Sequence, residues 1–581
     1  ILNHLADRVR HTFDVYNFQD DDWSLVAQVA GISVDLYGDI VWIGNHWETP
    51  RDGMNCPIGS TFVQENLGCT INFAILVPYW SPTGDPFWCK VAAMAVLAIF
   101  HVNERNDTVV PTASQLDAGN WAAAAGGRFA VTYMLLNSAD TDDDGNAGTL
   151  AFSEECLHYD ARRNGCAALI GAAYSRTSSP VATLGGVYNV PQVSYWSSSE
   201  ELSSESSYPY FSRVIVQDGH LASGWAHLCS HFNWTTVAQL HVSDVYGAGF
   251  ANSFIDAARE LGITIRTSQS YDFGSEETLA NAMDTIKASK ALILLVICYN
   301  EHLQTIMDLA EERGMIGDNF VWLVTDGVSD GARVLNHTDD PERLARQLFG
   351  ALRASSVGNS NTQRWQNAEA AYRERIAEIL KDNPELSLFL NLEEEEQFTC
   401  PDGDDVCSIM GWVYDAVWAA AMAASMMTEA DIGVHYWAQD VYENLKANVS
   451  FEGNSGTDVR MDEYGDRSAH DLRIYLKNWA SDGQEDGFTT AGFFDKNIID
   501  VRSWQCSPLQ RAEVHAESLA ITPPPAGHGW PSPRRLLAMD GHHLVACWPW
   551  MAFTPPPAGH GWRSPRRLLA MDGHHPAACW P

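Results

Sequence analysis

Two apolar runs that each end in a cluster of hydroxyl side chains limit the fold of this chain more than any other feature. Residues 167–170 lead through Gly171 to a turn rich in Ser and Thr, and residues 190–195 lead to a run of serines. Short apolar runs are typical of buried parallel strands, and small ligands bind beyond the carboxyl ends of such strands. Hydroxyls and helix-start amides at that place suit a small anion, typically a carboxylate.

The alternation of strand and helix patterns extends over most of the chain. Apolar runs at 71–80, 291–298 and 319–327 predict buried parallel strands. Residues 91–104 predict a helix that is apolar all round, and an apolar face with a helical period occurs at 250–261. This is the β-α-β order of a doubly wound sheet flanked by helices. The series is too long for one lobe, so we predict an α/β fold of two lobes with a cleft between them.

Composition excludes several classes of partner. The 581 residues allow more than one domain, and 36 basic against 74 acidic residues give a net charge of -38. This charge repels nucleic acid and anionic membranes, so no nucleic-acid partner is expected.

The sequence contains no clear membrane anchor or leader. No apolar run reaches the roughly 18 to 20 residues that span a bilayer, and the nearest candidate, 411–427, contains Asp415. We predict a buried helix there. The chain starts at Ile1 without a signal peptide, which suggests a fragment or a mature product, with any transmembrane region outside this chain.

The cysteines are scattered singly, unlike those of a zinc ribbon or a disulfide scaffold. Short separations allow local disulfides between Cys156 and Cys166 and between Cys400 and Cys407. We expect Cys229 and Cys298 to be buried free thiols. Glycosylation sequons, compatible with secretion, begin at Asn106, Asn233, Asn336 and Asn448.

The sequence gives only weak evidence for a metal, cofactor or catalytic site. DTDDDGN at 140–146 resembles the start of a calcium loop, but position twelve is Ala151 rather than glutamate, which favours a solvated acidic loop. The sequence has no phosphate-binding glycine loop, no HExxH and no Gly-x-Ser-x-Gly motif. We therefore expect no enzyme, no cofactor and no bound metal.

The order of elements resembles one family, the type I periplasmic-binding-protein or Venus flytrap fold of receptor ligand-binding regions. The segment NVSFEGNSGTDVRMDEYGDR at 448–467 is its most specific motif. The resemblance is closest to the ectodomains of class C G-protein-coupled receptors of the metabotropic glutamate and calcium-sensing type, and natriuretic-peptide-receptor regions are also similar. It implies a flytrap domain at 70–505, with lobe 1 at about 70–206 and 347–450 and lobe 2 at about 207–346 and 451–505.

The flanking segments differ from this domain. Asp7-Arg8 and the strand pattern that follows parallel Asp466-Arg467, so residues 1–53 resemble the tail of a preceding flytrap-like module. Residues 54–69 would be a linker that Cys56 and Cys69 close. In the last segment, 506–581, a sequence rich in Pro, Gly and His occurs twice, which predicts a disordered tail rather than a solenoid.

The resemblance also implies a ligand site. Ser175 and Ser198 match family positions that hold the α-carboxylate of an amino acid, whereas Asp218, Tyr246 and Asp326 match second-lobe positions that receive its ammonium group. Hydroxyl donors suit a carboxylate, and carboxylates with an aromatic face suit an ammonium. Ordinary roles stay open, because Ser and Asp are common at helix starts and turns.

The surroundings of the site suggest the ligand class. Tyr79, Trp80 and Trp196 suggest an aromatic wall for an apolar side chain, and no basic residue clearly matches the family position that holds a distal acid. We therefore predict an extracellular receptor region that senses an amino acid or related small molecule by cleft closure and dimerises through lobe 1. The alternatives are a peptide-binding ectodomain of a receptor guanylate cyclase and a solute-binding protein for amino-acid transport.

Overall fold

The computed structural model describes residues 68–501 with gaps at 81–85, 112–114, 117–129, 140–145, 158–165, 273, 318, 329–333, 336–337, 358–361, 401–404, 428–436, 469–472, 480–487 and 496–497. It also gives the short strands β1 (Phe13–Gln19), β2 (Asp22–Ala30), β3 (Ser33–Leu36), β4 (Ser60–Val63), β20 (Met539–Asp540) and β21 (His543–Leu544). Apart from β4, the start of β5, β20 and β21, the residues that concern the predicted Cys56–Cys69 linker, the DTDDDGN loop (except Asn146) and the terminal repeats lie outside the described residues. So does most of 1–53, where only the antiparallel sheet β1-β2-β3 is described.

The first lobe is built on a largely parallel sheet. Its order is β4-β5-β7-β8-β9, with β6 on β5, and only β4 is antiparallel. The strands are β5 (Gly68–Val77), β6 (Ala130–Asn137), β7 (Ala168–Ile170), β8 (Gln192–Ser194) and β9 (Phe211–Arg213). Apolar runs therefore form parallel strands, as the sequence pattern predicts.

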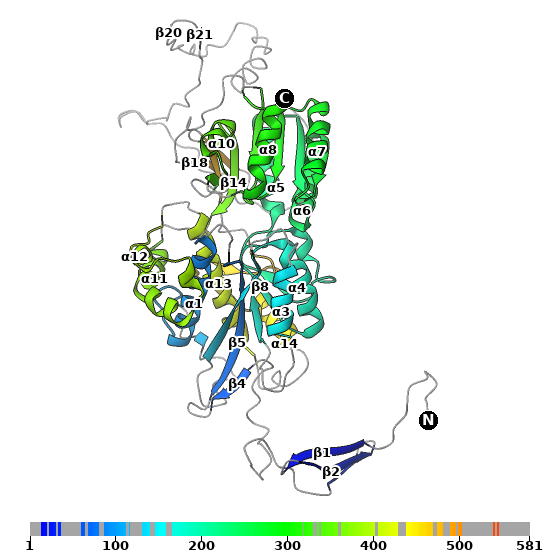
Figure 1. Ribbon diagram of the computed structural model, residues 1–581, viewed down its shortest axis with the longest axis vertical. Helices are drawn as coiled ribbons and strands as arrows, with labels where there is room; N and C mark the ends of the chain where they lie inside the picture. Colours follow the sequence, from blue (N-terminus) through cyan, green and yellow to red (C-terminus); the bar gives the residue numbers. More distant parts are fainter. Residues whose placement is uncertain are drawn as a thin grey trace, which may run out of the picture. The chain divides into compact units, whose positions relative to one another are not determined.

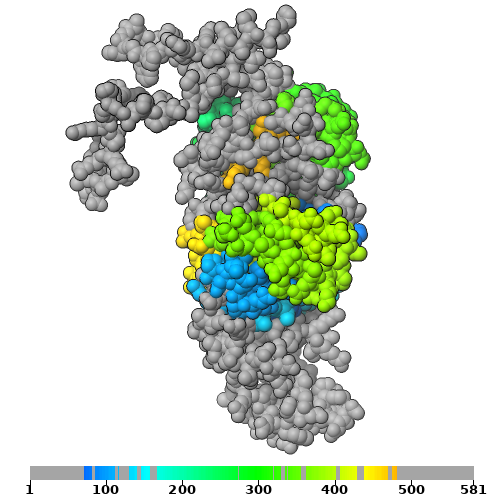
Figure 2. Space-filling view, turned by 90° about the vertical axis from the view of Figure 1, so that its left-hand side faces the viewer, coloured from blue at the N-terminus to red at the C-terminus, as the bar shows by residue number. Residues whose placement is uncertain are grey.

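Helices from distant parts of the chain cover this sheet. They are α1 (Phe87–Glu104), α3 (Asn146–Glu155), α4 (Ser175–Tyr188), α11 (Gln363–Asp382), α12 (Leu392–Glu395), α13 (Asp405–Ser425) and α14 (Trp437–Ala447). α1 packs beside α11 and α13 in one core, and Figure 2 shows the blue α1 region next to the yellow-green α11 region on one face.

Two of these helices are long and apolar enough to cross a membrane by length and composition. They are Phe87–Glu104 and residues 406–425, with 78% and 94% of the respective 18-residue windows buried inside the protein. The second overlaps 411–427 and is a core helix, in agreement with the sequence-based expectation.

The second lobe has its own mixed sheet and core. Its order is β11-β10-β12-β13-β14-β17-β18-β19, parallel from β11 to β14 and antiparallel from there on. The strands are β10 (Thr236–Val242), β11 (Thr264–Tyr271), β12 (Ile293–Ile297), β13 (Val321–Val324), β14 (Leu352–Val357), β17 (Arg473–Trp479), β18 (Phe488–Asp495) and β19 (Ile498–Val501). The helices are α5 (Asp218–His231), α6 (Val245–Glu260), α7 (Glu276–Ser289), α8 (Asn300–Glu312) and α10 (Pro341–Gln347). Figure 1 shows these helices around the second sheet. The fold is thus the two-lobed α/β arrangement that the sequence predicts.

The predicted lobe boundaries need two corrections. The hairpin of β15 (Ser450–Phe451) and β16 (Val459–Arg460) was predicted in the second lobe, but Phe451 and Val459 lie in the first-lobe core. Buried Asp415 of α13 accepts hydrogen bonds from the backbone N–H groups of the hairpin turn and fixes it there. Likewise, β9 pairs with β8, so the first crossing falls after Arg213 rather than near 207.

The predicted cysteine states agree with the structure. Disulfides join Cys156 to Cys166 and Cys400 to Cys407. Cys229 and Cys298 are free and buried in α5 and just after β12. Burial raises the pKa of the Cys229 thiol to about 12, so this thiol stays protonated and unreactive at neutral pH.

Candidate functional site

A small cavity lies where the carboxyl ends of strands from both lobes meet. Its volume is about 10 Å³, which is room for roughly one water molecule. The first lobe contributes Ala173, Tyr174, Ser175, Trp196 and Ser198, and the second contributes Tyr246, Tyr299, Asp326 and Gly327. Residues of both lobes therefore line one small cavity at this place.

The first-lobe wall consists of strand-to-helix turns. Ser175 is the first residue of α4, after β7, and Ser198 follows β8. The Ser175 Oγ accepts a hydrogen bond from the Ser199 N–H at 3.2 Å, which links the two turns. The Tyr174 side chain does not cap α4, and its carbonyl oxygen accepts hydrogen bonds from the N–H groups of Thr177 at 3.0 Å and Ser178 at 2.9 Å. This wall presents donors to the cavity.

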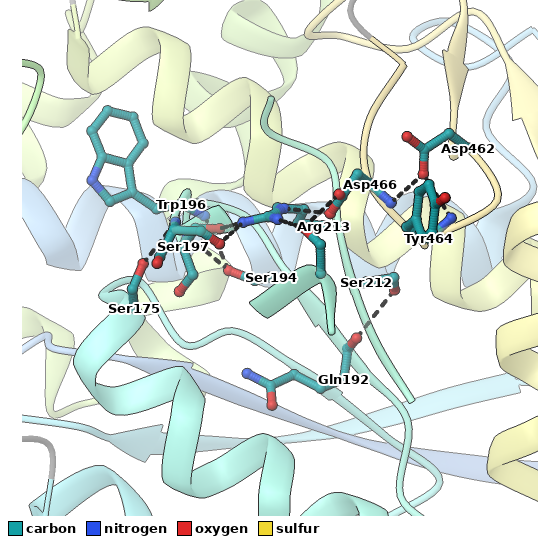
Figure 3. Close-up of polar contacts among 12 residues, drawn as sticks. Ser175, Gln192, Ser194, Trp196, Ser197, Ser212, Arg213, Asp462, Tyr464 and Asp466 are labelled. Carbon is teal, nitrogen blue, oxygen red and sulfur yellow. Dashed lines mark hydrogen bonds and ion pairs between the residues drawn. The ribbon is translucent and has the colours of Figure 1, made fainter. Parts of the chain in front are cut away.

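Buried Arg213 holds the serine turn in place. Its guanidinium donates to the carbonyl oxygens of Ser197 at 3.1 Å and Ser199 at 2.7 Å, and its Nε donates to Asp466 Oδ1 at 2.6 Å. Figure 3 shows Arg213 between the serine turn and Asp466, which precedes the crossing to β17. The ion pair is buried on both sides. It connects the serine turn that carries Ser198 to Asp466.

The second-lobe wall is a network around Tyr246. The Tyr246 hydroxyl lies 2.8 Å from Thr325 Oγ1 and 3.3 Å from Asp326 Oδ1, and the Gly327 N–H donates to it at 3.2 Å. Tyr246 lies in the first turn of α6, and Asp326 follows β13. Burial and the two nearby aspartates, Asp326 and Asp218, raise the pKa of Tyr246, so it remains a neutral donor.

Asp218 is the most unusual group at the site. It is the first residue of α5, it is 1% exposed, and its backbone N–H donates to the Ser198 carbonyl oxygen at 2.8 Å. Within the described parts of the chain, neither carboxylate oxygen has a hydrogen-bond partner of normal geometry. Burial, and then the charge of Asp326, raise the pKa of Asp218 well above its usual value, although Ser198 and Arg213 act in the opposite direction.

The structure brings the predicted residues together. Ser175, Ser198, Tyr246 and Asp326 line one cavity, and Asp218 is bonded to Ser198 beside it. The predicted aromatic wall is only partly correct. Trp196 lines the cavity, whereas Tyr79 packs against the first-lobe core and Trp80 is 46% exposed, because both follow β5 rather than β7 or β8.

Sequence reasoning missed three further residues. Tyr174 and Tyr299 line the cavity from opposite lobes, with ring centroids 5.6 Å apart. The Arg176 guanidinium lies 5.1 Å from the Tyr174 ring centroid and 5.0 Å from that of Tyr299, so it stacks on both lobes. Tyr299 is the second residue after β12, so the strand-end rule that selected the serines also applied to it.

The described residues contain no group of three or more His, Cys, Asp or Glu side chains arranged to hold a metal ion. What the site offers is hydroxyl donors on one lobe, carboxylates on the other, and tyrosine rings between them. Such a set can hold a small molecule with both an anionic and a cationic group.

Comparison with known proteins gives the family. The model of the family described as the receptor family ligand binding region matches residues 124–480, more than half of the 581 residues. The metabotropic glutamate receptor-like protein E of Dictyostelium discoideum is 26% identical over 400 residues, 68% of this chain and 41% of that protein. The human extracellular calcium-sensing receptor is 31% identical over 160 residues, 27% of this chain and 15% of the receptor. The chain thus spans less than half the length of these relatives.

These relatives are receptors, and the matched region contains both walls of the cavity. The chain therefore belongs to the receptor family ligand binding region and is a ligand-binding region of the class C G-protein-coupled receptor type.

Proposed function

We propose that this region binds an amino acid, or a related small zwitterion, between its lobes and signals by closing on it. The observation that carries the proposal is the buried carboxylate of Asp218, which makes no hydrogen bond of normal geometry to a described residue and lies beside Asp326. A buried carboxylate without a partner is costly, and such groups occur where a ligand supplies the missing charge.

The ligand groups are assigned by charge. An ammonium group would be held by Asp218 and Asp326, with the ring of Tyr246 beside it. A carboxylate would accept hydrogen bonds from Ser175, Ser198 and the first amides of α4. Because these groups belong to opposite lobes, a bound zwitterion would bridge them and favour the closed state.

The present cavity is too small for such a ligand. With room for about one water, the site would take up an amino acid only after the lobes have separated. Opening followed by closure on the ligand is the ordinary behaviour of hinged two-lobed domains. The side chain of the ligand would then lie among Tyr174, Trp196 and Tyr299.

The cellular setting follows from the same proposal. The region would lie on the extracellular face of a membrane receptor and act through G-protein-coupled machinery, with the membrane anchor outside this chain. Two disulfides and the exposed sequon residues Asn233 and Asn448 support an extracellular glycoprotein. The names of the relatives support a receptor rather than a transport protein.

The proposal predicts a selective loss of ligand response. In a thermal-shift screen of the common amino acids, with calcium as a separate arm, at least one amino acid should raise the unfolding midpoint of the purified protein. Ser175→Ala and Ser198→Ala should each weaken that ligand by about 10- to 100-fold, because a hydrogen bond to a charged group contributes about 1.5–3 kcal/mol. Isothermal titration calorimetry measures the loss.

The exposed Ser206, near the same turn, provides the control. Ser206→Ala should bind like the unmodified protein. If no amino acid shifts the midpoint, or if the Ser175 and Ser198 variants bind normally, the amino-acid site is wrong.

We also propose that the region dimerises through the first lobe. Leu150 of α3 and Val187 and Tyr188 of α4 are 57%, 69% and 55% exposed, and these helices pack side by side (Figure 1). Exposed large apolar side chains are typical of protein–protein contacts. A second copy is the natural occupant, because a self-complementary patch gives a closed dimer.

Charged substitutions should separate the dimer. Leu150→Glu with Val187→Glu is expected to lower the sedimentation coefficient from that of a dimer to that of a monomer and to leave the unfolding midpoint nearly unchanged, since both residues are exposed. Leu388→Glu, at a residue that is 74% exposed elsewhere in the first lobe, is the matched control. A monomeric native protein, or an unaffected dimer in the double variant, contradicts the proposal.

A further inference from the structure

Helix α6 of the second lobe contacts the first lobe at residues that do not line the cavity. The Ser199 Oγ donates to the Val245 carbonyl oxygen at 2.8 Å. Next to it, the Ser253 hydroxyl donates to the Glu200 carboxylate. Ser199 and Glu200 stand at the start of the 3-10 helix η2 (Glu200–Ser203), directly after the serine turn. We call these residues, together with Gly249, the α6 contact.

Gly249 is the point of closest approach in the α6 contact. A Cβ atom built there would lie 2.5 Å from Ser199 Oγ, 3.6 Å from Ser199 Cβ and 3.8 Å from the Glu200 backbone nitrogen. Glycine inside a helix is less favourable than alanine by about 1 kcal/mol, so local structure alone favours alanine at this position. Because Gly249 has no side chain, Ser199 of the first lobe can approach α6 closely. This space is needed only in the closed state, in which the two lobes are in contact.

We propose that the α6 contact sets the closing equilibrium of the cleft and thereby regulates ligand affinity from outside the binding site. The inference rests on the proposed function, since it concerns the closure of the same cleft. Ser199 and Glu200 lie on one lobe and Val245, Gly249 and Ser253 on the other, so their contacts exist only in the closed state. Any interaction made in one state alone shifts the population toward that state.

The closing equilibrium therefore changes the measured affinity for the ligand. The apparent dissociation constant equals the intrinsic one divided by the fraction of molecules that can close. A change at Gly249 should therefore weaken binding although no ligand atom touches it. The Arg213 hydrogen bond to the Ser199 carbonyl oxygen restrains the first-lobe side of the contact. The Ser199 backbone therefore cannot easily move away from α6.

Substitutions of graded size test the inference. In Gly249→Ala the new methyl group meets Ser199 Oγ, which has to rotate away and lose its hydrogen bond to Val245, so binding should weaken about 5-fold. In Gly249→Leu rotation of Ser199 is not sufficient, and binding should weaken more than about 50-fold, because the closed fraction falls. The unfolding midpoint of the unliganded variants should be unchanged or higher, because both residues favour helix.

A double variant separates a steric effect from general damage. Ser199→Ala removes the atom that Gly249→Ala would meet and leaves the backbone bond to Ser175 Oγ intact. Ser199→Ala with Gly249→Ala should therefore bind within about 2-fold of Ser199→Ala alone, a clear departure from additivity. Glu260→Leu, at an exposed residue about three turns further along the same helix, is the control for a leucine on α6.

Closure is measured directly by energy transfer between dyes on Leu388→Cys in the first lobe and Glu277→Cys in the second. The full chain is measured without additive and with a mixture of the common amino acids. We expect Gly249→Leu to shift the unliganded protein toward the open distance and to abolish the response to the mixture. A Gly249→Leu protein that closes and binds like the parent overturns the inference. A parent protein that does not respond to the mixture while Gly249→Leu still opens it refutes the amino-acid ligand but supports the α6 contact.

Discussion

Replacing Asp218 by asparagine is expected to raise the unfolding midpoint of the unliganded protein and, in the same molecule, to weaken amino-acid binding by at least about 30-fold. The binding loss follows because removal of one partner of a buried charge pair costs about 2–5 kcal/mol. The gain in stability follows because the native carboxyl is buried, makes no hydrogen bond of normal geometry to a described residue and lies beside Asp326. Binding sites often carry such a cost to stability.

The stability gained by Asp218→Asn should increase with pH. The folded-state pKa of Asp218 is raised, so below the unfolded value of about 3.9 both states carry the proton and the group costs nothing. As pH rises above that value, Asp218 is deprotonated in the unfolded chain but still protonated in the folded protein. The free energy of unfolding therefore falls until the pH exceeds the folded-state pKa. The difference in stability between Asp218→Asn and the parent should therefore be close to zero near pH 4 and should grow toward neutral pH.

Asp415 provides the matched control. It is also fully buried and its pKa is raised, but its oxygens accept hydrogen bonds from the backbone N–H groups of Asn454 and Ser455 at 2.7 Å each. Asp415→Asn should therefore destabilise the protein, whereas Asp218→Asn stabilises it. Thermal unfolding across pH and calorimetric titration make both comparisons. A destabilised Asp218→Asn protein, or one that binds the amino acid normally, contradicts the assignment of Asp218.

Removing Arg213 is expected to be the most damaging single change in the first lobe. Arg213→Met leaves the buried Asp466 carboxylate without its ion-pair partner and removes the guanidinium hydrogen bonds to the carbonyl oxygens of Ser197 and Ser199. Loss of one partner from a buried pair costs about 3–5 kcal/mol. Because these donors hold the serine turn, ligand binding should weaken as well, even at temperatures where the variant is fully folded.

Two further variants make this test specific. Arg213→Met with Asp466→Leu removes both charges and should recover much of the lost stability, but not the ligand affinity, since the serine turn still lacks its donor. Arg259→Met affects an ion pair with Asp256 in which both side chains are 71% exposed, and its loss should cost less than about 1 kcal/mol. Chemical denaturation measures the stabilities. Equal losses in Arg213→Met and Arg259→Met would contradict this account.

Much of the fold could be predicted because its strongest determinant is local. Buried parallel strands need unbroken apolar runs, and β12 and β13 arise from such runs. Ser175 and Ser198 could be predicted because a residue that follows a parallel strand must lie at the carboxyl edge of the sheet. Both signals depend only on neighbours in sequence.

The parts that could not be predicted depend on contacts across the molecule. The hairpin of β15 and β16 belongs to the first lobe because Asp415, far away in the chain, binds its turn. Arg176 stacks on Tyr299 only because the lobes meet there, and Gly249 looks like an ordinary weak point in a helix until Ser199 is placed next to it. No local pattern contains the relative position of two lobes.

The order in which the chain visits its lobes has a consequence for synthesis on the ribosome. The chain leaves the first lobe after β9, returns to it for α11 to α14, and only then supplies β17 to β19 to the second sheet. Neither lobe is continuous in sequence. The first-lobe core is complete only when residues up to Met461 have been made, and the second-lobe sheet stays incomplete until residues near 501 have left the exit tunnel. A premature stop or a cut before β17 would therefore deprive the second lobe of part of its sheet, however far the cut lies from the cleft.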